Sequence, residues 1–238
     1  LRWPIDNSLK RTLKQQTITG VSRRAKCILV HTSQGALIIH LEMSGCLKIV
    51  TQNEPIIKHD HYDIILPSVI LRYNDPRRFG SLHYTEAPLS KHKLLTHLGP
   101  EPLSTDFNAE YLQQRAAKSS SAIKTFLMNQ KVVVGVGNIY ASEALFSAGI
   151  NPKRAAKQIS LARYTLLVDA IKNILDKSIQ AGGTTLKDFY ASDGKPGYFS
   201  QELNVYGRAG EACLSCQHEI KKIILGQRSS FYCTHCQT

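Results

Sequence analysis

The sequence has no long hydrophobic run. None of its 238 residues lies in a stretch that approaches the ~18 consecutive apolar residues of a membrane-spanning helix, which excludes an integral membrane protein. The first residues, Leu1 to Asp6, are of mixed character and show no cleavable signal pattern. Internal repeats and low-complexity tracts are missing too, and a hydrophobic fraction of 42% excludes a wholly disordered chain. We therefore expect one or two domains with a sizeable core.

Acidic residues are scarce relative to basic ones. The chain has 18 Asp and Glu against 30 Lys and Arg, which gives a formal net charge of +12. A surplus of this size favours a polyanionic partner, most often a nucleic acid and sometimes an acidic membrane surface. A charge that serves solubility and has no partner is the alternative.

The six cysteines are too unevenly spread for a secreted disulfide scaffold. Four of them form two Cys-x2-Cys pairs near the end of the chain, and the segment 217–232 between the pairs can form a β-hairpin. Each pair can direct two thiolates at one ion, so four thiolates predict a single tetrahedral Zn²⁺ in a reducing compartment. The zinc is expected to be structural, because four protein ligands leave no open position for chemistry. Two disulfides or four unrelated thiols are the alternative. The predicted ligands are Cys213, Cys216, Cys233 and Cys236, whereas Cys27 and Cys46 are expected to bind no metal.

The hydrophobic pattern changes its period along the chain. The first hundred residues contain short apolar segments bounded by turn signals, which predicts an antiparallel sandwich or barrel. These segments are Lys26–His31, Ala36–Glu42, Cys46–Thr51, His61–Leu66 and Ser68–Tyr73. After the Pro- and Gly-rich link at Leu98–Pro102 the period becomes helical. The predicted helices are Ala109–Ala117, Ala122–Met128, Asn138–Ala148 and Leu161–Gln180.

The helix predicted over Leu161–Gln180 has the strongest pattern. Ser160 is placed to cap its start, and Gly182 and Gly183 are placed to stop it. Its apolar stripe is formed by Tyr164, Leu167, Val168, Ile171, Leu175 and Ile179. The sequence therefore predicts an α+β multi-domain fold. Its parts are an N-terminal β domain at 1–98, a helical domain at 99–200 and a zinc finger at 201–238.

A glycine-rich turn precedes the helix predicted to start near Asn138. In Val134–Asn138, closely spaced glycines let backbone N–H groups approach an anion at a helix N-terminus. Asn138 can cap the helix, and its side-chain amide can also donate a hydrogen bond. No Gly-Lys-Ser/Thr follows, so a polymer phosphate is a better candidate ligand than a mononucleotide. A turn that needs glycine only for its dihedral angles is the alternative.

Basic and apolar side chains also occur at predicted turns. Arg228 precedes the second cysteine pair, where a metal-stapled hairpin can present it to phosphate. In Asp75–Gly80, Arg77 and Phe79 suit insertion into a DNA groove. Met43 shares the phase of a strand that contains Leu37, Ile39 and Leu41, which by pattern alone favours a core position. Lys26 is either a phosphate ligand or a solvated charge.

Taken together, these motifs resemble the bacterial formamidopyrimidine-DNA glycosylases, and the resemblance runs from Leu1 to Thr238. The matching segments are Arg23–Lys26, His40–Gly45, Asp75–Gly80, Leu95–Pro100, Val134–Ser142, Gly183–Phe189, Val205–Arg208 and the four-cysteine tail. The resemblance implies a β-sandwich joined to a helix–two-turn–helix domain with a zinc hairpin, with DNA in the cleft between the domains.

The resemblance also implies a function and a set of roles. Such enzymes flip an oxidised purine (8-oxoguanine or a formamidopyrimidine) out of duplex DNA, cut its glycosidic bond, and break the strand by β,δ-elimination. A monomeric protein of the bacterial cytoplasm, associated with the nucleoid through DNA, is implied. Met43, Arg77 and Phe79 resemble the triad that fills the gap left by the flipped base. Asn138, Arg228, Lys26 and Tyr206 resemble backbone ligands, and the segment Thr184–Tyr198 resembles the loop that closes over the extruded base.

One family feature is not found at the start of these 238 residues. The family begins with Pro-Glu, whose proline amine attacks C1′ of the sugar and forms a Schiff base. Pro4 matches an interior proline of the family, and only Lys26 remains as a secondary catalytic candidate. By motif alignment the chain starts about thirty residues into the pattern, so we expect the first helix to be missing and excision by this polypeptide to be poor. A non-catalytic module that binds damaged DNA is the alternative function.

Overall fold

The computed structural model describes residues 1, 3–183 and 203–238, which fall into two compact units. Unit 1 contains Leu1–Thr96, and unit 2 contains His97–Ala181 together with residues 203–238. Unit 1 is built mainly from strands, and unit 2 from helices and one β-hairpin. The predicted α+β fold is therefore confirmed.

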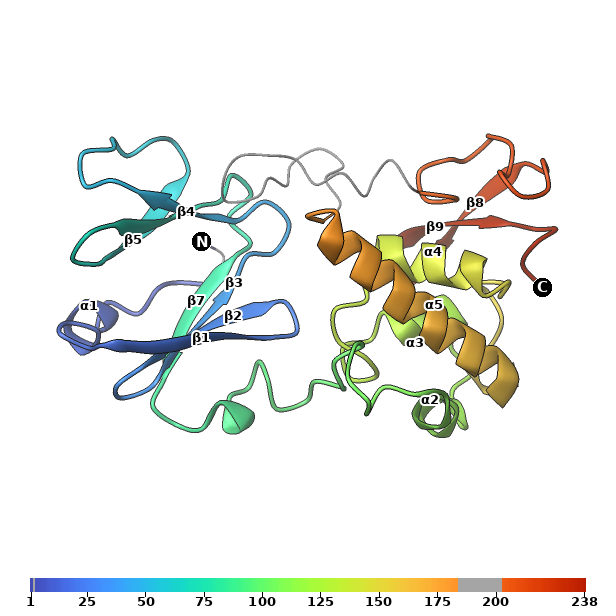
Figure 1. Cartoon of the computed structure of the whole chain (residues 1–238), viewed down its shortest axis with the longest axis horizontal. Helices are drawn as coiled ribbons and strands as arrows, with labels where there is room; N and C mark the ends of the chain where they lie inside the picture. Colours follow the sequence, from blue (N-terminus) through green and yellow to red (C-terminus); the bar gives the residue numbers. More distant parts are fainter. Residues whose placement is uncertain (2, 184–202) are drawn as a thin grey trace. The chain divides into compact units, whose positions relative to one another are not determined.

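Unit 1 contains two antiparallel sheets (Figure 1). The first has the strand order β1 (Ile18–Arg24), β2 (Cys27–Thr32), β3 (Ala36–His40) and β7 (Ser81–Thr85). The second has the order β4 (Cys46–Val50), β6 (Ile70–Asn74) and β5 (Asp60–Ile65). A short helix, α1 (Leu9–Thr12), precedes the sheets, and a 3₁₀ turn, η1 (Leu89–Lys91), follows them.

The core of unit 1 lies between these sheets. Leu37 and Ile39 of β3 are buried, as their spacing of two predicts, and they belong to one apolar cluster with Val30 of β2. Leu47 of β4 and Tyr62 of β5 pack against the same cluster from the second sheet. Side chains from both sheets thus share one apolar layer, as in a β-sandwich.

The strand predictions for unit 1 need four corrections, and the first is that β7 was not predicted. β1 was not expected, because as an edge strand it pairs with β2 alone, and its polar, exposed sequence carries no apolar alternation. Lys26 lies in the turn between β1 and β2, and the strand begins at Cys27. β3 ends at His40, so Met43 lies beyond the strand that its phase suggested.

Unit 2 contains the predicted helices with small shifts at their ends. They are α2 (Ala109–Ala116), α3 (Ile123–Leu127), α4 (Asn138–Ser147) and α5 (Leu161–Gln180), with a 3₁₀ turn, η2 (Ala156–Gln158), before α5. The backbone N–H of Arg163 donates to Ser160 Oγ, so the predicted cap of α5 is confirmed. None of the described helices combines the length and the apolar character that a membrane span needs.

One residue of the α5 stripe departs from the expectation. Tyr164, Leu167, Val168 and Ile171 are buried, whereas Ile179 is 66% exposed. Near the end of α5 the buried position belongs to Ser178 instead, whose hydroxyl shares a hydrogen bond with the hydroxyl of Tyr140 on α4. Helical periodicity alone cannot reveal this polar contact.

The C-terminal hairpin of unit 2 packs against the helices. Its strands are β8 (Ile220–Leu225) and β9 (Arg228–Cys233), and β9 lies beside α4 (Figure 1). The buried Gln237 side chain donates to the carbonyl of Ile150 (2.9 Å) and accepts from the backbone N–H of Cys233 (2.8 Å). The cysteine-bearing segment is thereby tied to the helical core.

Candidate nucleic-acid interface and metal centre

The four predicted metal ligands converge at one point of unit 2. Their Sγ atoms all lie within 4.8 Å of one another, with Cys213 and Cys236 at 3.9 Å and Cys216 and Cys233 at 3.4 Å. A tetrahedral Zn²⁺ with bonds of about 2.3 Å would hold its sulfur atoms about 3.8 Å apart, which fits this cluster. None of the four forms a disulfide. The chemistry of the donor set and its spacing therefore suit a structural zinc ion.

The other two cysteines lie in unit 1. Cys27 is buried in β2, and burial raises the pKa of its thiol to about 11. Burial also raises the pKa of Cys46. Among the described residues, neither thiol belongs to a group of His, Cys, Asp and Glu side chains close enough to share a metal ion.

The hairpin carries Arg228 at the start of β9. Gly226 and Gln227 form its turn with positive φ angles of 53° and 61°, and Arg228 pairs with Leu225 directly beside the turn. The Arg228 side chain is exposed. A cation at a fixed position on a stapled hairpin is well placed to bind an external anion.

The hairpin turn is seated on α3. A Cβ atom at Gly226 would lie 3.2 Å from the side chain of Thr125, so glycine allows the turn to approach the helix closely. The neighbouring Lys124 is buried and donates from Nζ to Ser229 O (2.9 Å) and Ser230 Oγ (2.8 Å). Burial lowers the pKa of Lys124 to about 8. These contacts hold the first residues of β9, and with them Arg228, against the helical core.

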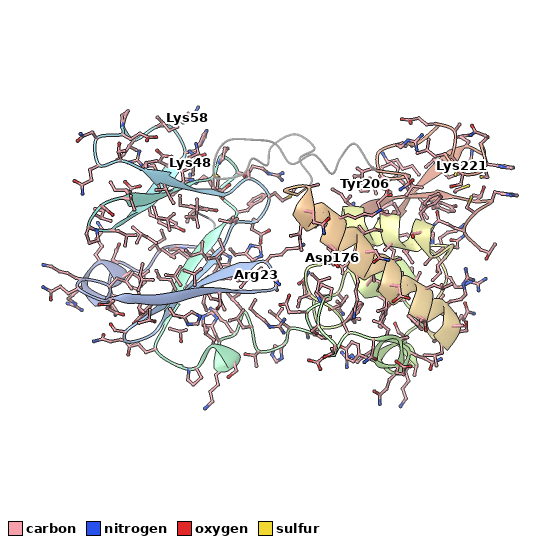
Figure 2. The ribbon with its side chains drawn as sticks, in the orientation of Figure 1. Arg23, Lys48, Lys58, Asp176, Tyr206 and Lys221 are labelled. Atoms are coloured by element: carbon pink, nitrogen blue, oxygen red, sulfur yellow. The ribbon has the colours of Figure 1, made fainter. Side chains whose placement is uncertain are left out.

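Asn138 and Tyr206 come together at the start of α4. Asn138 is the first residue of the helix, and its Nδ2 donates to the Tyr206 hydroxyl at 3.2 Å. The ring of Tyr206, which Figure 2 labels, packs edge-on against Phe231 of β9, and 4.9 Å separate the ring centroids. The structure therefore links two predicted phosphate ligands, and Phe231 connects them to the strand that begins with Arg228.

The cap of α4 differs from the prediction. Gly137 occupies the N-cap position, and no side chain caps the helix. Asn138 therefore keeps its amide for Tyr206, while its Oδ1 is buried and accepts no hydrogen bond from the described part of the chain. An unsatisfied polar atom of this kind costs about 1–3 kcal/mol unless water or a ligand supplies a donor.

The predicted wedge residues lie on two turns of unit 1 that share one buried carboxylate. Asp75 is fully buried and accepts hydrogen bonds from Ser44 Oγ (2.5 Å), Tyr73 Oη (3.2 Å) and the backbone N–H groups of Gly80 (2.9 Å) and Arg77 (3.2 Å). Burial raises the pKa of Asp75, but these hydrogen bonds outweigh it and the pKa is lowered. The ionised carboxylate thus fixes the Asp75–Gly80 turn.

Met43 belongs to the second of these turns, next to Ser44. It is 51% exposed, so the core position that its strand phase favoured is wrong. Phe79 is 41% exposed, and the Arg77 guanidinium lies 5.1 Å from the centre of its ring. Met43, Arg77 and Phe79 are therefore all exposed, with Arg77 and Phe79 in direct contact.

Lys26 lies in unit 1, in a two-residue turn. Ala25 has a positive φ of 53°, and Arg23 at the end of β1 donates to its carbonyl (Figure 2). The Lys26 side chain is exposed, and its charge affects His40 on β3. Burial lowers the pKa of His40, Glu42 raises it, and Lys26 lowers it further.

One predicted part of the site lies outside the described residues, and another part was not predicted from the sequence. The predicted loop at Thr184–Tyr198 lies outside the described residues. Asp75, Lys124 and Glu143 are buried polar residues that hold predicted site residues in place, and none was predicted. Asp75 lies within a motif that was noticed, but Glu143 and Lys124 interrupt apolar helix faces without any local signal.

Comparisons with known proteins cover nearly the whole chain. Residues 1–82 match the formamidopyrimidine-DNA glycosylase N-terminal domain, residues 98–190 match its H2TH domain, and residues 210–238 match the zinc finger found in FPG and IleRS. A formamidopyrimidine-DNA glycosylase of Escherichia coli is 55% identical over all of this chain and 88% of its own length. That of Hydrogenovibrio crunogenus is 53% identical over all of this chain and 85% of its own length.

Solved structures agree with these matches. A Lactococcus lactis FPG mutant in complex with Fapy-dG-containing DNA has a TM-score of 0.89 and 36% identity, covering 97% of this chain and 86% of that one. The L. lactis Fpg complex with abasic-site DNA has a TM-score of 0.88 with the same identity and coverage. The chain described here belongs to the formamidopyrimidine-DNA glycosylase family.

Proposed function

We propose that the chain binds duplex DNA that contains an oxidised purine or an abasic site, and that it does so as a monomer. It is a base-excision repair glycosylase of oxidised purines, in keeping with relatives at 52–55% identity. Its net charge of +12 suits a polyanionic partner. The nucleoid of the bacterial cytoplasm is its proposed place of action. The alternative of a non-catalytic module is not favoured, because the matched relatives are glycosylases.

The contact between Asn138 and Tyr206 carries this proposal. An amide and a phenol meet at the N-terminus of a ten-residue helix, where backbone N–H groups and the helix dipole favour an anion. Arg228 is exposed on the hairpin strand that also holds Phe231 against Tyr206. Three donors of this kind are typical of a grip on DNA phosphates, which fixes position without reading sequence.

Roles for the residues of unit 1 complete the proposal. Met43, Arg77 and Phe79 would fill the space left by the extruded base, with Arg77 facing the orphaned cytosine. Their exposure supports a role in which they contact a partner. Lys26 would bind a backbone phosphate from its turn.

The finer chemistry is also a proposal. Strand cleavage by β,δ-elimination requires an amine that forms a Schiff base with C1′ of the sugar. In the family pattern that amine belongs to an N-terminal Pro-Glu, and these 238 residues do not begin with Pro-Glu. Lys26 is the secondary candidate, and its side chain is exposed. Excision and borohydride trapping are therefore best measured on two polypeptides, one with and one without a Pro-Glu start.

Binding is the first test. Fluorescence anisotropy with an abasic-site duplex and a matched undamaged duplex should show tighter binding to the damaged one. Asn138→Ala should weaken binding to both duplexes, because a phosphate contact is common to them. Asn173→Ala, at an exposed position on α5, is the matched control and should bind like the parent protein. Equal binding by the Asn138 and Asn173 variants would contradict the phosphate role of Asn138.

A further inference from the structure

A buried carboxylate lies five residues after Asn138 on the same helix. Glu143 of α4 is 3% exposed. Its Oε1 accepts from the backbone N–H groups of Val205 (3.0 Å) and Tyr206 (2.8 Å). Its Oε2 accepts from the backbone N–H (2.8 Å) and the side-chain amide (3.2 Å) of Asn204. One side chain therefore holds three consecutive residues, Asn204 to Tyr206.

This carboxylate is a costly choice for its position. Its neighbours Ala141, Ala144 and Leu145 are buried and apolar, so an apolar side chain would suit that face of α4 better. A buried carboxylate must be satisfied by several donors, and here all four donors are neutral N–H groups. Hydrogen bonds are directional, so these four fix the backbone of residues 204–206 relative to α4. Apolar packing is not directional and would leave that backbone free to shift.

The fixed segment controls one of the proposed phosphate ligands. The backbone N–H of Tyr206 donates to Glu143 Oε1, and the Tyr206 hydroxyl accepts from the Asn138 amide 3.2 Å away. Phe231 supports the ring from β9. Tyr206 is thus held at two points from a single helix. Asn138 contacts its hydroxyl, and Glu143 contacts its backbone N–H.

We propose that Glu143 is a positioning residue for phosphate binding, and that it acts by clamping Tyr206 against Asn138. The proposal rests on the proposed function, in which Asn138 and Tyr206 contact the DNA backbone. Glu143 itself is too deeply buried to contact DNA. Its effect on binding must therefore pass through Tyr206, and this requirement separates a positioning role from a general role in folding.

A double-mutant cycle tests the proposal in the full chain. Glu143→Gln keeps the size of the side chain but places an NH₂ group against backbone donors, so it breaks part of the clamp. It should weaken binding to an abasic-site duplex by roughly fivefold to tenfold, the effect of one lost hydrogen bond. In the Tyr206→Phe background, which already lacks the hydroxyl, the same change should weaken binding less than about twofold. Glu110→Gln, at an exposed position on α2, is the matched control.

The outcomes separate this proposal from the one on which it rests. If Asn138→Ala and Tyr206→Phe weaken binding but Glu143→Gln does not, the clamp is refuted and the proposed function stands. Equal losses from Glu143→Gln in both backgrounds also refute it. If neither Asn138→Ala nor Tyr206→Phe weakens binding, the phosphate roles themselves fail. Should Glu143→Gln not fold, as judged by circular dichroism, Glu143→Asp replaces it in the cycle. It keeps the charge but shortens the reach, and the same outcomes decide.

Discussion

The ammonium group of Lys124 on α3 lies 2.8 Å from the hydroxyl of Ser230 on β9, and both residues are buried. The same group donates to the carbonyl of Ser229, the residue that follows Arg228. Lys124 thus joins the helical core to the hairpin at the point where the hairpin presents its arginine. Both acceptors are neutral, so two hydrogen bonds, and no opposite charge in this contact, offset the cost of burying the ammonium group.

Stability should depend on pH through Lys124. Burial lowers its pKa in the folded state to about 8, whereas an unfolded lysine keeps its proton up to a pKa of ~10.4. Between these values the unfolded chain binds more protons, so stability rises with pH across this window and the gain is absent below pH 8. Lys124→Met removes the titrating group. The free energy of unfolding of the parent, measured with urea, should therefore rise relative to that of the variant from pH 8 to pH 10. The exposed Lys118→Met should show no such trend, and a flat difference for Lys124→Met would contradict the assignment.

Gly80 should tolerate no side chain. A Cβ atom at this position would overlap the Tyr73 hydroxyl, which is itself bonded to Asp75. Gly80→Ala must therefore displace Tyr73 or the turn, at a cost of about 1–3 kcal/mol in the free energy of unfolding. Gly20→Ala is the control, because a Cβ there meets nothing within 4 Å. Equal unfolding free energies for the two variants would show that the packing around Tyr73 has been misjudged.

Zinc should bind to the cysteine cluster with a stoichiometry of about one ion per chain. Cys233 is fully buried within the hairpin core, and Cys233→Ser removes one of the four thiolates. We expect this variant to lose the metal, and with it the ordered hairpin and most affinity for DNA. Cys27→Ser lies in unit 1 and should keep the full zinc content. Elemental analysis of both purified proteins checks this, and zinc retained at the parent level by Cys233→Ser would refute the site.

Local patterns in the sequence are sufficient for much of the fold. Short-range regularities predicted the burial of Leu37 and Ile39, the stripe of α5 except at Ile179, and the cluster formed by the two Cys-x2-Cys pairs. β1 was missed because an exposed edge strand has no apolar period to detect.

The candidate site was predicted less completely, for a physical reason. Its side chains are held by buried polar contacts between distant parts of the chain, such as Lys124 with Ser230 and Glu143 with Val205. Neither contact leaves a periodic trace in the sequence. Met43 shows the converse, since its phase matched a strand that had already ended at His40.

Arg228 and Phe79 should affect DNA binding in different ways. Arg228 is exposed on the hairpin and is proposed to contact phosphate, so Arg228→Ala should weaken binding to damaged and undamaged duplexes alike, by about 1.5–3 kcal/mol. The slope of log K against log salt concentration should fall by about one unit, because one fewer counterion is released. Anisotropy titrations at four salt concentrations measure both quantities.

Phe79→Ala removes no charge, so the salt dependence of binding should stay as in the parent protein. Phe79 is 41% exposed and lies against the Arg77 guanidinium. As the proposed wedge, it would contact DNA only once a base has left the stack. The variant should therefore bind undamaged DNA normally and lose about tenfold of its preference for a duplex with an 8-oxoguanine–cytosine pair, since unstacking one base step costs a few kcal/mol that the wedge offsets in part. If both variants lost the same preference and the same salt slope, phosphate contact and wedge could not be separate roles, and the assignment of these two residues would have to be abandoned.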